Sequence, residues 1–356
     1  MQSLDEKTWA QLSAFGDDAP LCIKTTDSSI DGVRLIDDDE KSVPYVTRSD
    51  SNNGLARFVS PKNYEFGSDD GGCITVGLDT QTAFYQPHKF VTGQNIQVIT
   101  GESLNEDVAQ FMVPILRQQM TAKFNWGGNG ATLSRMKRLT VMLPVTDSGE
   151  PDYAYMAEYA QQKRDTMLAK YRAYVEARIA ELGEVAEIPA LDEKEKPIFI
   201  SSMFELVRGR ENNMAMLEDG DTPLISAKAN NNGLKGFVHN PKKIIAGQCI
   251  TLNNDGDGGA GLAYYQPANM ALDSHVTALV PLIDMSAFVM LFIAKCISGL
   301  HGFFGHGLSI SNPRAKRLRI MLPVTDSGEP DYKYMEQYSK NMMLRKYRQY
   351  LTFAQQ

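Results

Sequence analysis

Polar side chains gather around two Asn-Asn-Gly tripeptides, at residues 52–54 and 231–233. Arg48 precedes the first tripeptide and Lys228 precedes the second, and both side chains can donate hydrogen bonds to guanine. The asparagine amides can pair bidentately with adenine. These residue types suit the reading of base edges in a nucleic acid. Asn-Asn-Gly is also a turn signal, because asparagine and glycine tolerate the left-handed conformation, so a purely structural interpretation stays open.

The candidate base-contacting residues are polar and aromatic side chains of the variable loops and of the segments beside them. In the first half of the chain they are Thr47, Arg48, Ser49, Ser51, Asn52, Asn53, Tyr85, Gln86, Asn125 and Trp126. In the second half they are Ser226, Lys228, Asn230, Asn231, Asn232, Asp255, Tyr265, Gln266, Phe304 and His306. A separate basic group suits contact with phosphates, although a solvated surface is the alternative: Lys123, Arg135, Lys137, Arg138, Arg314, Lys316, Arg317 and Arg319.

The chain is built from two copies of one unit. Residues 143–153 return letter for letter as residues 322–332, and the Cys-Ile-Thr of residues 73–75 returns at residues 249–251. The loops between these shared segments differ, as in residues 76–82 of the first copy. A repeated frame with varied loops is the pattern expected of one scaffold that presents two different recognition surfaces.

Short strands and turns must position these side chains. Residues 43–47 and 222–226 are apolar runs that lead into the polar segments, and residues 95–99 alternate with period two. Residues 108–120 and 287–297 have the apolar pattern of short helices. The sequence therefore predicts an α+β fold with small irregular sheets and long loops.

A long helix is predicted at the end of each copy. Pro151 suits a first helical turn, and neither proline nor glycine follows until Gly183. Apolar residues at three-four spacing then form one stripe: Leu168, Tyr171, Val175, Ile179 and Leu182. About 30 residues at ~1.5 Å each make a rod of roughly 45 Å. The second helix runs from residue 330 to about residue 352 and is predicted to be shorter by about a turn.

These patterns divide the chain into five predicted segments. They are a first module (residues 1–145), a first long helix (146–183), an acidic linker (184–197), a second module (198–324) and a second long helix (325–356).

Composition limits the class of protein. The 356 residues are 43% apolar and 22% charged, which is enough for two globular domains. No apolar run approaches the ~20 residues that cross a bilayer, and the N-terminus lacks a signal-peptide pattern, so we expect a cytoplasmic protein. The net charge of −7 weighs against a general polyanion binder but allows segregated basic surfaces. The cysteines lack zinc spacing and are expected to be buried reduced thiols: Cys22, Cys73, Cys249 and Cys296.

Sequence motifs for catalysis and metal binding are missing. The chain has no Gly-x-Ser-x-Gly, no phosphate-binding Walker loop and no His-Glu-x-x-His, so we expect no enzyme activity in this chain alone. His275, His301 and His306 are an alternative metal or acid–base cluster, but the glycine-rich setting of His301 and His306 favours a loop role. Residues 255–259 lack the remaining oxygen ligands of a calcium loop, and no metal site is predicted.

In this order, and repeated twice, the motifs resemble a known family. They are the polar segment of residues 45–55, the glycine-rich run of residues 255–261 with Tyr-Gln-Pro at 265–267, and the duplicated segment that leads into a helix. Together they look like the specificity (S) subunits of restriction-modification systems, in particular the type IIB (BcgI-like) form with two target recognition domains. The first copy departs from the family pattern by lacking the Asp-Gly-Asp-Gly-Gly run.

The resemblance implies a mechanism. Two target recognition domains bind the two half-sites of a bipartite, asymmetric duplex DNA sequence with a non-specific gap, which a ~45 Å separation sets at about 13 base pairs. The two long helices pack as an antiparallel coiled coil and hold the domains at a fixed spacing. Because the loops differ, the two half-sites are expected to differ in sequence.

The resemblance also implies partners. Methylation and cleavage belong to methyltransferase/endonuclease subunits, two per specificity subunit, which dock on the helices and module flanks of a bacterial or archaeal cytoplasmic complex. No cofactor is expected in this subunit, since S-adenosylmethionine and Mg²⁺ would belong to the partners. The alternative is an adaptor that binds no nucleic acid and carries two repeated ligand- or protein-binding modules, for which the pI of about 5.4 leaves room.

Overall fold

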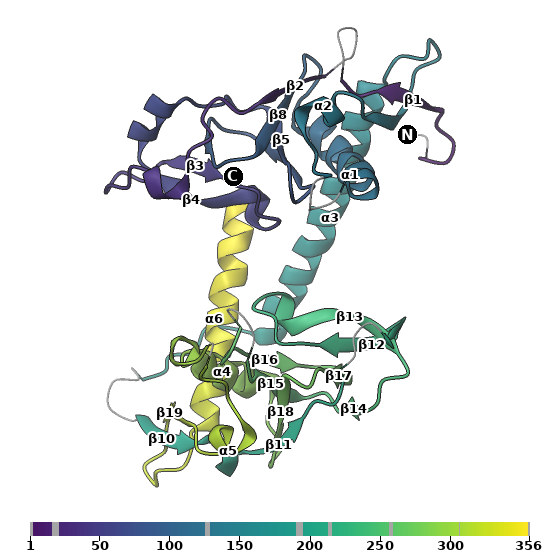
Figure 1. The fold of residues 1–356 in the computed structure, drawn as a ribbon. Helices are drawn as coiled ribbons and strands as arrows, with labels where there is room; N and C mark the ends of the chain where they lie inside the picture. The colour runs from purple at the N-terminus through teal and green to yellow at the C-terminus, as the bar shows by residue number, and fades with distance from the viewer. Residues whose placement is uncertain are drawn as a thin grey trace. The chain divides into compact units, whose positions relative to one another are not determined.

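The computed structural model describes residues 3–15, 21–124, 129–189, 195–212, 216–255, 259–305 and 307–354. The chain divides into two compact units, unit 1 (Met1–Tyr171) and unit 2 (Arg172–Gln356) (Figure 1). The boundary falls inside the long helix α3 (Tyr153–Leu182). Each unit contains the same series of strands and helices, as the sequence repeat predicts.

In its described residues, unit 1 holds three small sheets. Its strands are β1 (Trp9–Ser13), β2 (Cys22–Thr25), β3 (Val43–Val46), β4 (Leu55–Val59), β5 (Cys73–Gly77), β6 (Ala83–Gln86), β7 (Val91–Thr92), β8 (Ile96–Thr100) and β9 (Thr140–Pro144). An antiparallel sheet has the order β2-β8-β5-β6, a second sheet has the order β4-β3-β7, and β1 pairs with β9. In the second sheet β3 runs parallel to β7 and antiparallel to β4.

Unit 2 repeats this topology. Its strands are β10 (Glu195–Phe199), β11 (Phe204–Arg208), β12 (Glu218–Ile225), β13 (Leu234–His239), β14 (Ile244–Ile245), β15 (Cys249–Asn253), β16 (Ala263–Gln266), β17 (Met270–Leu272), β18 (Val276–Pro281) and β19 (Arg319–Pro323). The order β11-β18-β15-β16 matches the first sheet of unit 1, and β10-β19 matches β1-β9. The sheet β13-β12-β17-β14 adds the short strand β14.

Helices pack on these sheets. They are α1 (Glu106–Lys123), α2 (Leu133–Met136), α4 (Ala287–Ser298), α5 (Asn312–Ala315) and α6 (Tyr332–Phe353), besides α3. Short 3-10 turns are η1 (Gly32–Arg34), η2 (Asn52–Gly54), η3 (Pro61–Phe66), η4 (Ile200–Ser202), η6 (Asn231–Gly233) and η7 (His301–Phe303). The α+β fold class, the strand runs and the two predicted short helices are confirmed.

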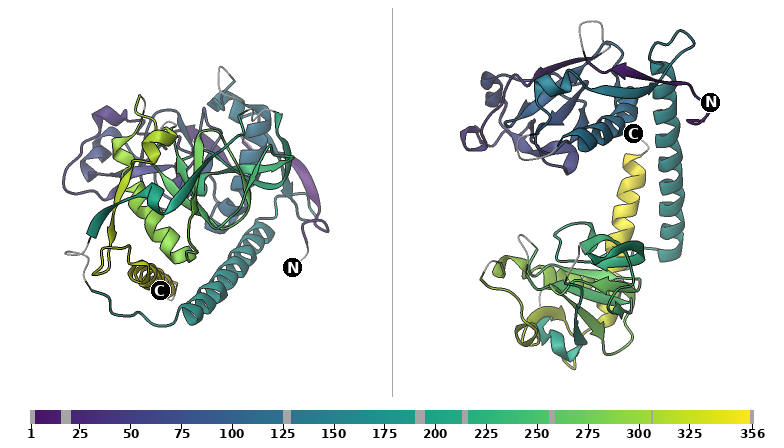
Figure 2. Two further views of the ribbon diagram at one scale, coloured as in Figure 1. Left: turned by 90° about the horizontal axis from the view of Figure 1, so that it is seen from below. Right: turned by 45° about the vertical axis from the view of Figure 1, so that its right-hand side comes forward.

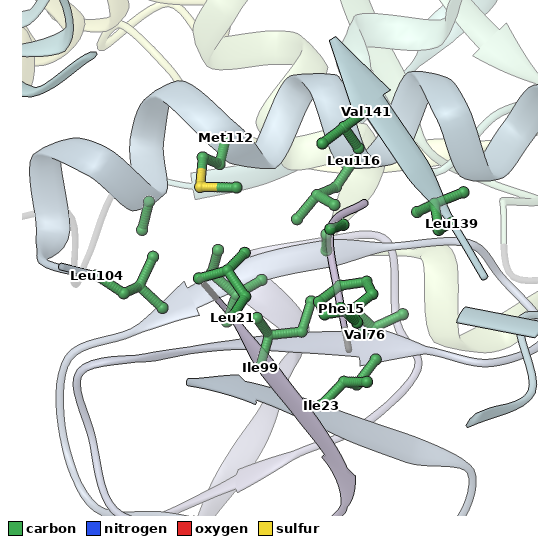
Figure 3. Close-up of a cluster of buried hydrophobic side chains, with 14 of the residues drawn as sticks. Phe15, Leu21, Ile23, Val76, Ile99, Leu104, Met112, Leu116, Leu139 and Val141 are labelled. Atoms are coloured by element: carbon green, nitrogen blue, oxygen red, sulfur yellow. The ribbon is translucent and has the colours of Figure 1, made fainter. Parts of the chain in front are cut away.

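The core of unit 1 lies between α1 and the sheet that contains β5. Asn105 begins the helix, because its side chain accepts a hydrogen bond from the backbone N–H of Val108 at 3.0 Å. One helix face is then apolar at four-residue spacing, with Met112 and Leu116 fully buried. Figure 3 shows these two side chains pointing toward Leu21 and Ile99 on the sheet.

In unit 2, α4 occupies the corresponding place and also contacts α6 directly. The hydroxyl of Ser339 on α6 donates to the backbone oxygen of Phe288 at 2.9 Å, which a small side chain permits. Phe292 and Tyr338 meet edge to face, with ring centroids 5.4 Å apart. α4 is therefore anchored on the long helix of its own unit.

The duplicated segment makes the same strand-to-helix joint in both copies. After β9 and β19 the chain turns at Gly149 and Gly328, which have φ of 85° and 86°. Asp152 and Asp331 then cap the long helices, since each carboxylate accepts from the backbone N–H three residues on, at 3.0 Å. The turn needs a glycine and the helix cap needs an acid. This requirement explains why these residues are identical in the two copies.

The long helices follow the prediction closely. Figure 2 shows α3 as one unbroken helix, which ends where Gly183 takes a φ of 78°. α3 has 30 residues and α6 has 22, so the second helix is shorter by about two turns rather than the one expected. Of the predicted apolar stripe, Val175 is fully buried, whereas Leu168 and Tyr171 are about half exposed.

The segment after α3 is tied to unit 2. Ala186 exchanges two backbone hydrogen bonds with the side chain of Asn341, at 3.1 and 2.8 Å. The hydroxyl of Tyr334 donates to the backbone oxygen of Pro189 at 3.1 Å. Residues 195–197, predicted as the end of the linker, instead begin β10, because they pair with β19 as β1 pairs with β9.

The cysteines only partly match the expectation of buried thiols. Cys73 and Cys249 are fully buried at matching places of β5 and β15, and burial raises the pKa of each thiol to about 12. Cys296 is half-buried, with a thiol pKa raised to about 11 by burial. The prediction is wrong for Cys22, which is exposed on β2.

Candidate nucleic-acid interface

Each Asn-Asn-Gly tripeptide forms a left-handed turn. The φ angles are 51°, 56° and 75° for residues 52–54, and 50°, 53° and 77° for residues 231–233. Glycine is required at the third place, because a Cβ on Gly54 would lie 3.2 Å from the backbone oxygen of Thr47 and one on Gly233 would lie 3.0 Å from Ile225. The structural interpretation of the tripeptide is therefore confirmed, and nucleic-acid contact stays a prediction.

In unit 1 two side chains hold this turn against β6: Asn53, the second asparagine of the tripeptide, and Gln86, the last residue of β6. The amide of Asn53 donates to the backbone oxygen of Tyr85 at 2.7 Å. The amide of Gln86 donates to the backbone oxygen of Asn53 and to the hydroxyl of Thr75, both at 3.0 Å. Gln86 is 6% exposed. These donors are occupied inside the protein, so base reading through them would require breaking the turn.

Unit 2 repeats this arrangement. Asn232 donates to the backbone oxygen of Tyr265 at 2.9 Å. Gln266 donates to the backbone oxygen of Asn232 at 2.9 Å and to the hydroxyl of Thr251 at 3.1 Å. The first asparagines of the two turns, Asn52 and Asn231, are exposed. The second asparagines are exposed too, but their amides hold the turn, so the first asparagines are the better candidates for contact with a ligand.

The residues before each turn form its stem. The backbone N–H of Thr47 donates to Gly54 at 2.8 Å, and that of Ser226 donates to Gly233 at 2.9 Å. In unit 1 the hydroxyls of Ser49 and Ser51 are hydrogen-bonded to each other at 3.0 Å, with Ser51 exposed. Asn230 is the exposed residue that precedes the turn of unit 2.

The predicted aromatic contacts serve mainly in packing. Tyr85 and Tyr265 are half-buried against the cores of their units, and burial raises the pKa of both phenols. The hydroxyl of Tyr265 also donates to Gln248 at 2.6 Å. Phe304 is half-buried against the unit 2 core. Three further predicted contacts lie outside the described residues: Asn125, Trp126 and His306.

Arg48 belongs to a polar group of unit 1 that is centred on Asp79. Its guanidinium forms an ion pair with Asp79, and the amide of Asn95 donates to the same carboxylate oxygen at 3.2 Å. The Arg48 side chain is 42% exposed and that of Asp79 is 24% exposed. The Arg48 guanidinium is therefore accessible to solvent, and the less exposed carboxylate of Asp79 fixes its position.

In unit 2 the carboxylate at the place of Asp79 is Asp255, and its partner is His275, which occupies the place of Asn95. The Nδ1 atom of His275 lies 2.8 and 2.9 Å from the two carboxylate oxygens of Asp255. This hydrogen bond is the main reason that the pKa of His275 is raised above its ordinary value. The backbone confirms the equivalence, because Asn254 donates to the oxygen of His275 at 2.9 Å as Leu78 donates to that of Asn95 at 3.0 Å.

The His275–Asp255 pair lines an open polar pocket of about 470 Å³ in unit 2. The lining residues are Ser226, Ala227, Lys228, Lys235, Asp255, Asp273 and His275. The structure thus brings together three predicted contacts, Ser226, Lys228 and Asp255, although Ser226 is only 5% exposed. The Lys228 ammonium donates to the backbone oxygen of Leu234 at 3.1 Å.

The predicted phosphate-binding residues fall into two kinds. Lys137 and Arg138 are exposed after α2, and Lys316 and Arg317 are exposed at the matching place after α5. The other members are placed by local contacts: Lys123 ends α1, Arg135 donates to Gly130 at 3.0 Å, Arg314 donates to Ser309, and the Arg319 guanidinium lies 4.3 Å from the ring centre of Phe199. The first kind suits contact with a polyanion.

Three residues of these polar groups were missed in the sequence: Asp79, Asn95 and His275. A signal for them exists, because aligning the two Cys-Ile-Thr segments places Asp79 opposite Asp255, and aligning the two Tyr-Gln-Pro segments places Asn95 opposite His275. In the sequence, His275 suggests a metal or acid–base cluster with His301 and His306 rather than a partner of Asp255. Among the described residues no group of His, Cys, Asp and Glu could hold a metal ion, and the His301 ring instead contacts the backbone oxygen of Ala260.

Comparison with known proteins gives one family match that covers most of the chain. The model of the type I restriction modification DNA specificity domain matches residues 31–168 and again residues 176–350. A relative from Heyndrickxia coagulans, described as the type II restriction enzyme BgcI specificity subunit S.BcgI, is 25% identical over 306 residues, which cover 85% of this chain and 86% of the relative.

Among solved structures, a type I S subunit from M. genitalium is 13% identical, covers 99% of this chain and 92% of its own, and has a TM-score of 0.49. The HsdS subunit from Thermoanaerobacter tengcongensis is 14% identical, covers 95% of this chain and 92% of its own, and has a TM-score of 0.33.

Within the described part of the chain, no helix is long and apolar enough to cross a membrane.

Proposed function

Because the chain belongs to the family of type I restriction modification DNA specificity domains, we propose that it is the specificity subunit of a type IIB-like restriction-modification enzyme. Each unit is a target recognition domain that reads one half-site of a bipartite, asymmetric duplex sequence with a non-specific gap. The observation that carries this proposal is the match of both copies to the family. The paired polar groups around Arg48 and His275 support it, because each presents hydrogen-bonding side chains from equivalent loops.

The recognition surface that we propose is narrower than the sequence suggested. The base-reading residues are those that are exposed or line the open pocket. They are Arg48, Asn52, Lys228, Asn231, Asp255 and His275. The turn-holding amides of Asn53, Gln86, Asn232 and Gln266 position these residues. Lys137, Arg138, Lys316 and Arg317 contact phosphates and set the register.

The two long helices form the spacer between the half-sites in this proposal, packed as an antiparallel coiled coil. Contacts inside unit 2 support that packing. The rings of Tyr174 at the end of α3 and Tyr347 on α6 meet edge to face with centroids 6.3 Å apart. Val175 and Leu344 are both fully buried. A helix of 30 residues is about 45 Å long, which corresponds to a spacing of about 13 base pairs.

Methylation and cleavage are assigned to partner methyltransferase/endonuclease subunits, two per specificity subunit, in the cytoplasm of the host cell. S-adenosylmethionine and Mg²⁺ belong to those partners and not to this chain. An apolar pocket of about 580 Å³ in unit 1 is a suitable docking place, because it lies between Trp9, Phe111 on α1 and Met167 on α3. Met167 is 70% exposed there.

The test is to co-purify the chain with its partner subunits and to map the bases that the complex methylates. We expect one two-part sequence with a fixed gap, and binding that weakens steeply with salt. Competition between duplexes supplies a second readout. Equal affinity of the full complex for all duplexes would show that the proposal is wrong.

A further inference from the structure

A carboxylate occupies the same backbone position in both units and holds a different nitrogen donor in each. In unit 1, Asp79 holds the guanidinium of Arg48. In unit 2, Asp255 holds the imidazole of His275, and the residue at the place of Arg48 is Ala227. The side chains of Arg48 and His275 are 42% and 56% exposed, so both donors face solvent. The two units therefore present one permanent cation and one titratable group on a common frame.

We propose, on the basis of the DNA-recognition function above, that the His275–Asp255 pair is a base-reading site of unit 2, which selects guanine while the imidazole is protonated and disfavours guanine once it is neutral. The geometry sets this behaviour. The Asp255 carboxylate accepts the hydrogen bond of the ring Nδ1–H, so Nε2 is the ring nitrogen that remains for contact with a base. In the imidazolium Nε2–H donates, and guanine offers the acceptors O6 and N7.

Deprotonation reverses the hydrogen-bonding sense of this atom. With the proton of Nδ1 held by Asp255, neutral His275 presents Nε2 as an acceptor. An acceptor repels O6 and N7 of guanine and suits the exocyclic amino group of adenine or cytosine. Arg48 in unit 1 only donates and stays charged at all accessible pH, so its half-site has no such change.

The surrounding charges oppose one another. Asp255 and Asp273 favour the imidazolium, whereas Arg208, whose Nε donates to Ser274 at 2.9 Å, disfavours it. Lys228 and Lys235 on the pocket wall also disfavour it. The direct hydrogen bond to Asp255 has the largest effect and raises the pKa of His275. The guanine preference is thus present at low pH and is lost as pH rises through this raised value.

The experiment measures affinity of the full complex for duplexes that differ at single positions of each half-site, between about pH 6 and pH 9. We expect the guanine preference at one position of the unit 2 half-site to fall on the order of tenfold over this range. His275→Asn, which copies the residue of unit 1, should remove the pH dependence. Ala227→Arg combined with His275→Asn should restore guanine preference at all pH values.

The matched control is His239→Asn, since His239 is an exposed histidine of the same unit that does not line the pocket. It should leave the pH profile unchanged. A specific complex whose unit 2 half-site shows no pH dependence in the wild type, or the same dependence after His275→Asn, would overturn the inference. Loss of all sequence preference at every pH would instead overturn the proposed function, so the two failures are distinguishable.

Discussion

At the residue scale, the exposed donors of the two units are held by carboxylates that lie far from them in sequence. Arg48 pairs with Asp79, and His275 with Asp255. A guanidinium that an ion pair already holds in place loses less conformational entropy on binding than a mobile one. The carboxylate therefore preorganises the donor in one orientation.

Arg48→Ala should weaken binding to the unit 1 half-site by about 1–3 kcal/mol and relax the choice of base at one position, because a donor to guanine is removed. Competition binding with single-base variants measures both effects. Arg57→Ala is the control, since Arg57 is an equally exposed arginine on β4 with only a long ion pair to Asp37. Equal losses for both variants would mean that only charge matters.

The buried thiols give a second prediction at this scale. A thiol pKa of about 12 leaves Cys73 and Cys249 with a thiolate fraction of about 10⁻⁴ at pH 8, and both are fully buried. Alkylation of the folded protein at pH 8 should therefore modify Cys22 first, as measured by mass spectrometry. Rapid modification of Cys73 would show that β5 is not part of a stable core.

At the element scale, the left-handed turn and the long helix are the features that would present the proposed DNA-binding and docking surfaces. The turn needs a glycine at its third position, as the positive φ of Gly54 and Gly233 shows. The glutamines of β6 and β16 then fix the turn to the main sheet. The exposed asparagines are consequently presented on a rigid support rather than on a free loop.

Gly233→Ala should destabilise unit 2 by about 1–3 kcal/mol, because an added Cβ meets Ile225 at 3.0 Å and the φ of 77° is strained for alanine. Gly236→Ala is the matched control in the same hairpin, where a Cβ meets nothing within 4 Å. The free energies of unfolding of the two variants are compared by chemical denaturation, with hydrogen exchange of unit 2 amides as the local measurement. The account of the turn would fail if both variants had the same stability.

Met167→Asp on α3 should weaken association with the partner subunits about tenfold or more, because a charge enters the apolar pocket of unit 1. DNA-independent complex formation, measured by co-purification and calorimetry, gives the readout. Gln161→Asp introduces the same carboxylate at an exposed position of α3 outside the pocket and should have little effect. Unchanged association of the Met167 variant would place the docking surface elsewhere.

At the scale of the whole molecule, one fold occurs twice with different loops. Apart from the added strand β14, the sheet orders, the helix positions and the strand-to-helix joints match between units. The units differ at the Arg48 and His275 groups and in the loops beside them, and also in the added strand β14 and the length of the long helix. This arrangement is what the proposal of two different half-sites requires.

Exchanging residues 47–53 and 76–82 together for their counterparts in the second copy should change specificity at one half-site only. The loops hold the predicted base contacts, while the strands that they join are shared between the copies. Mapping of methylated sites before and after the exchange measures the result. Equal changes at both half-sites would refute the assignment of one unit to each half-site.

The sequence by itself determined the duplication, the α+β class, the strands, the turns and the long helices. These features depend on local patterns: period-two and three-four spacing, the Asn-Asn-Gly signal, a proline and an acid at a helix start, and a glycine at its end. The resemblance to specificity subunits followed from the order of the same local motifs.

Only the tertiary structure decided which polar side chains face outward. Gln86 and Asn53 lie far apart in the chain, and sequence spacing does not reveal that the glutamine amide bonds to the turn instead of meeting a ligand. Likewise the Asp255–His275 pair joins two strand ends that become neighbours only when β15 pairs with β18. Residue type specifies what a side chain can donate or accept, but non-local packing decides whether that capacity is already satisfied inside the protein.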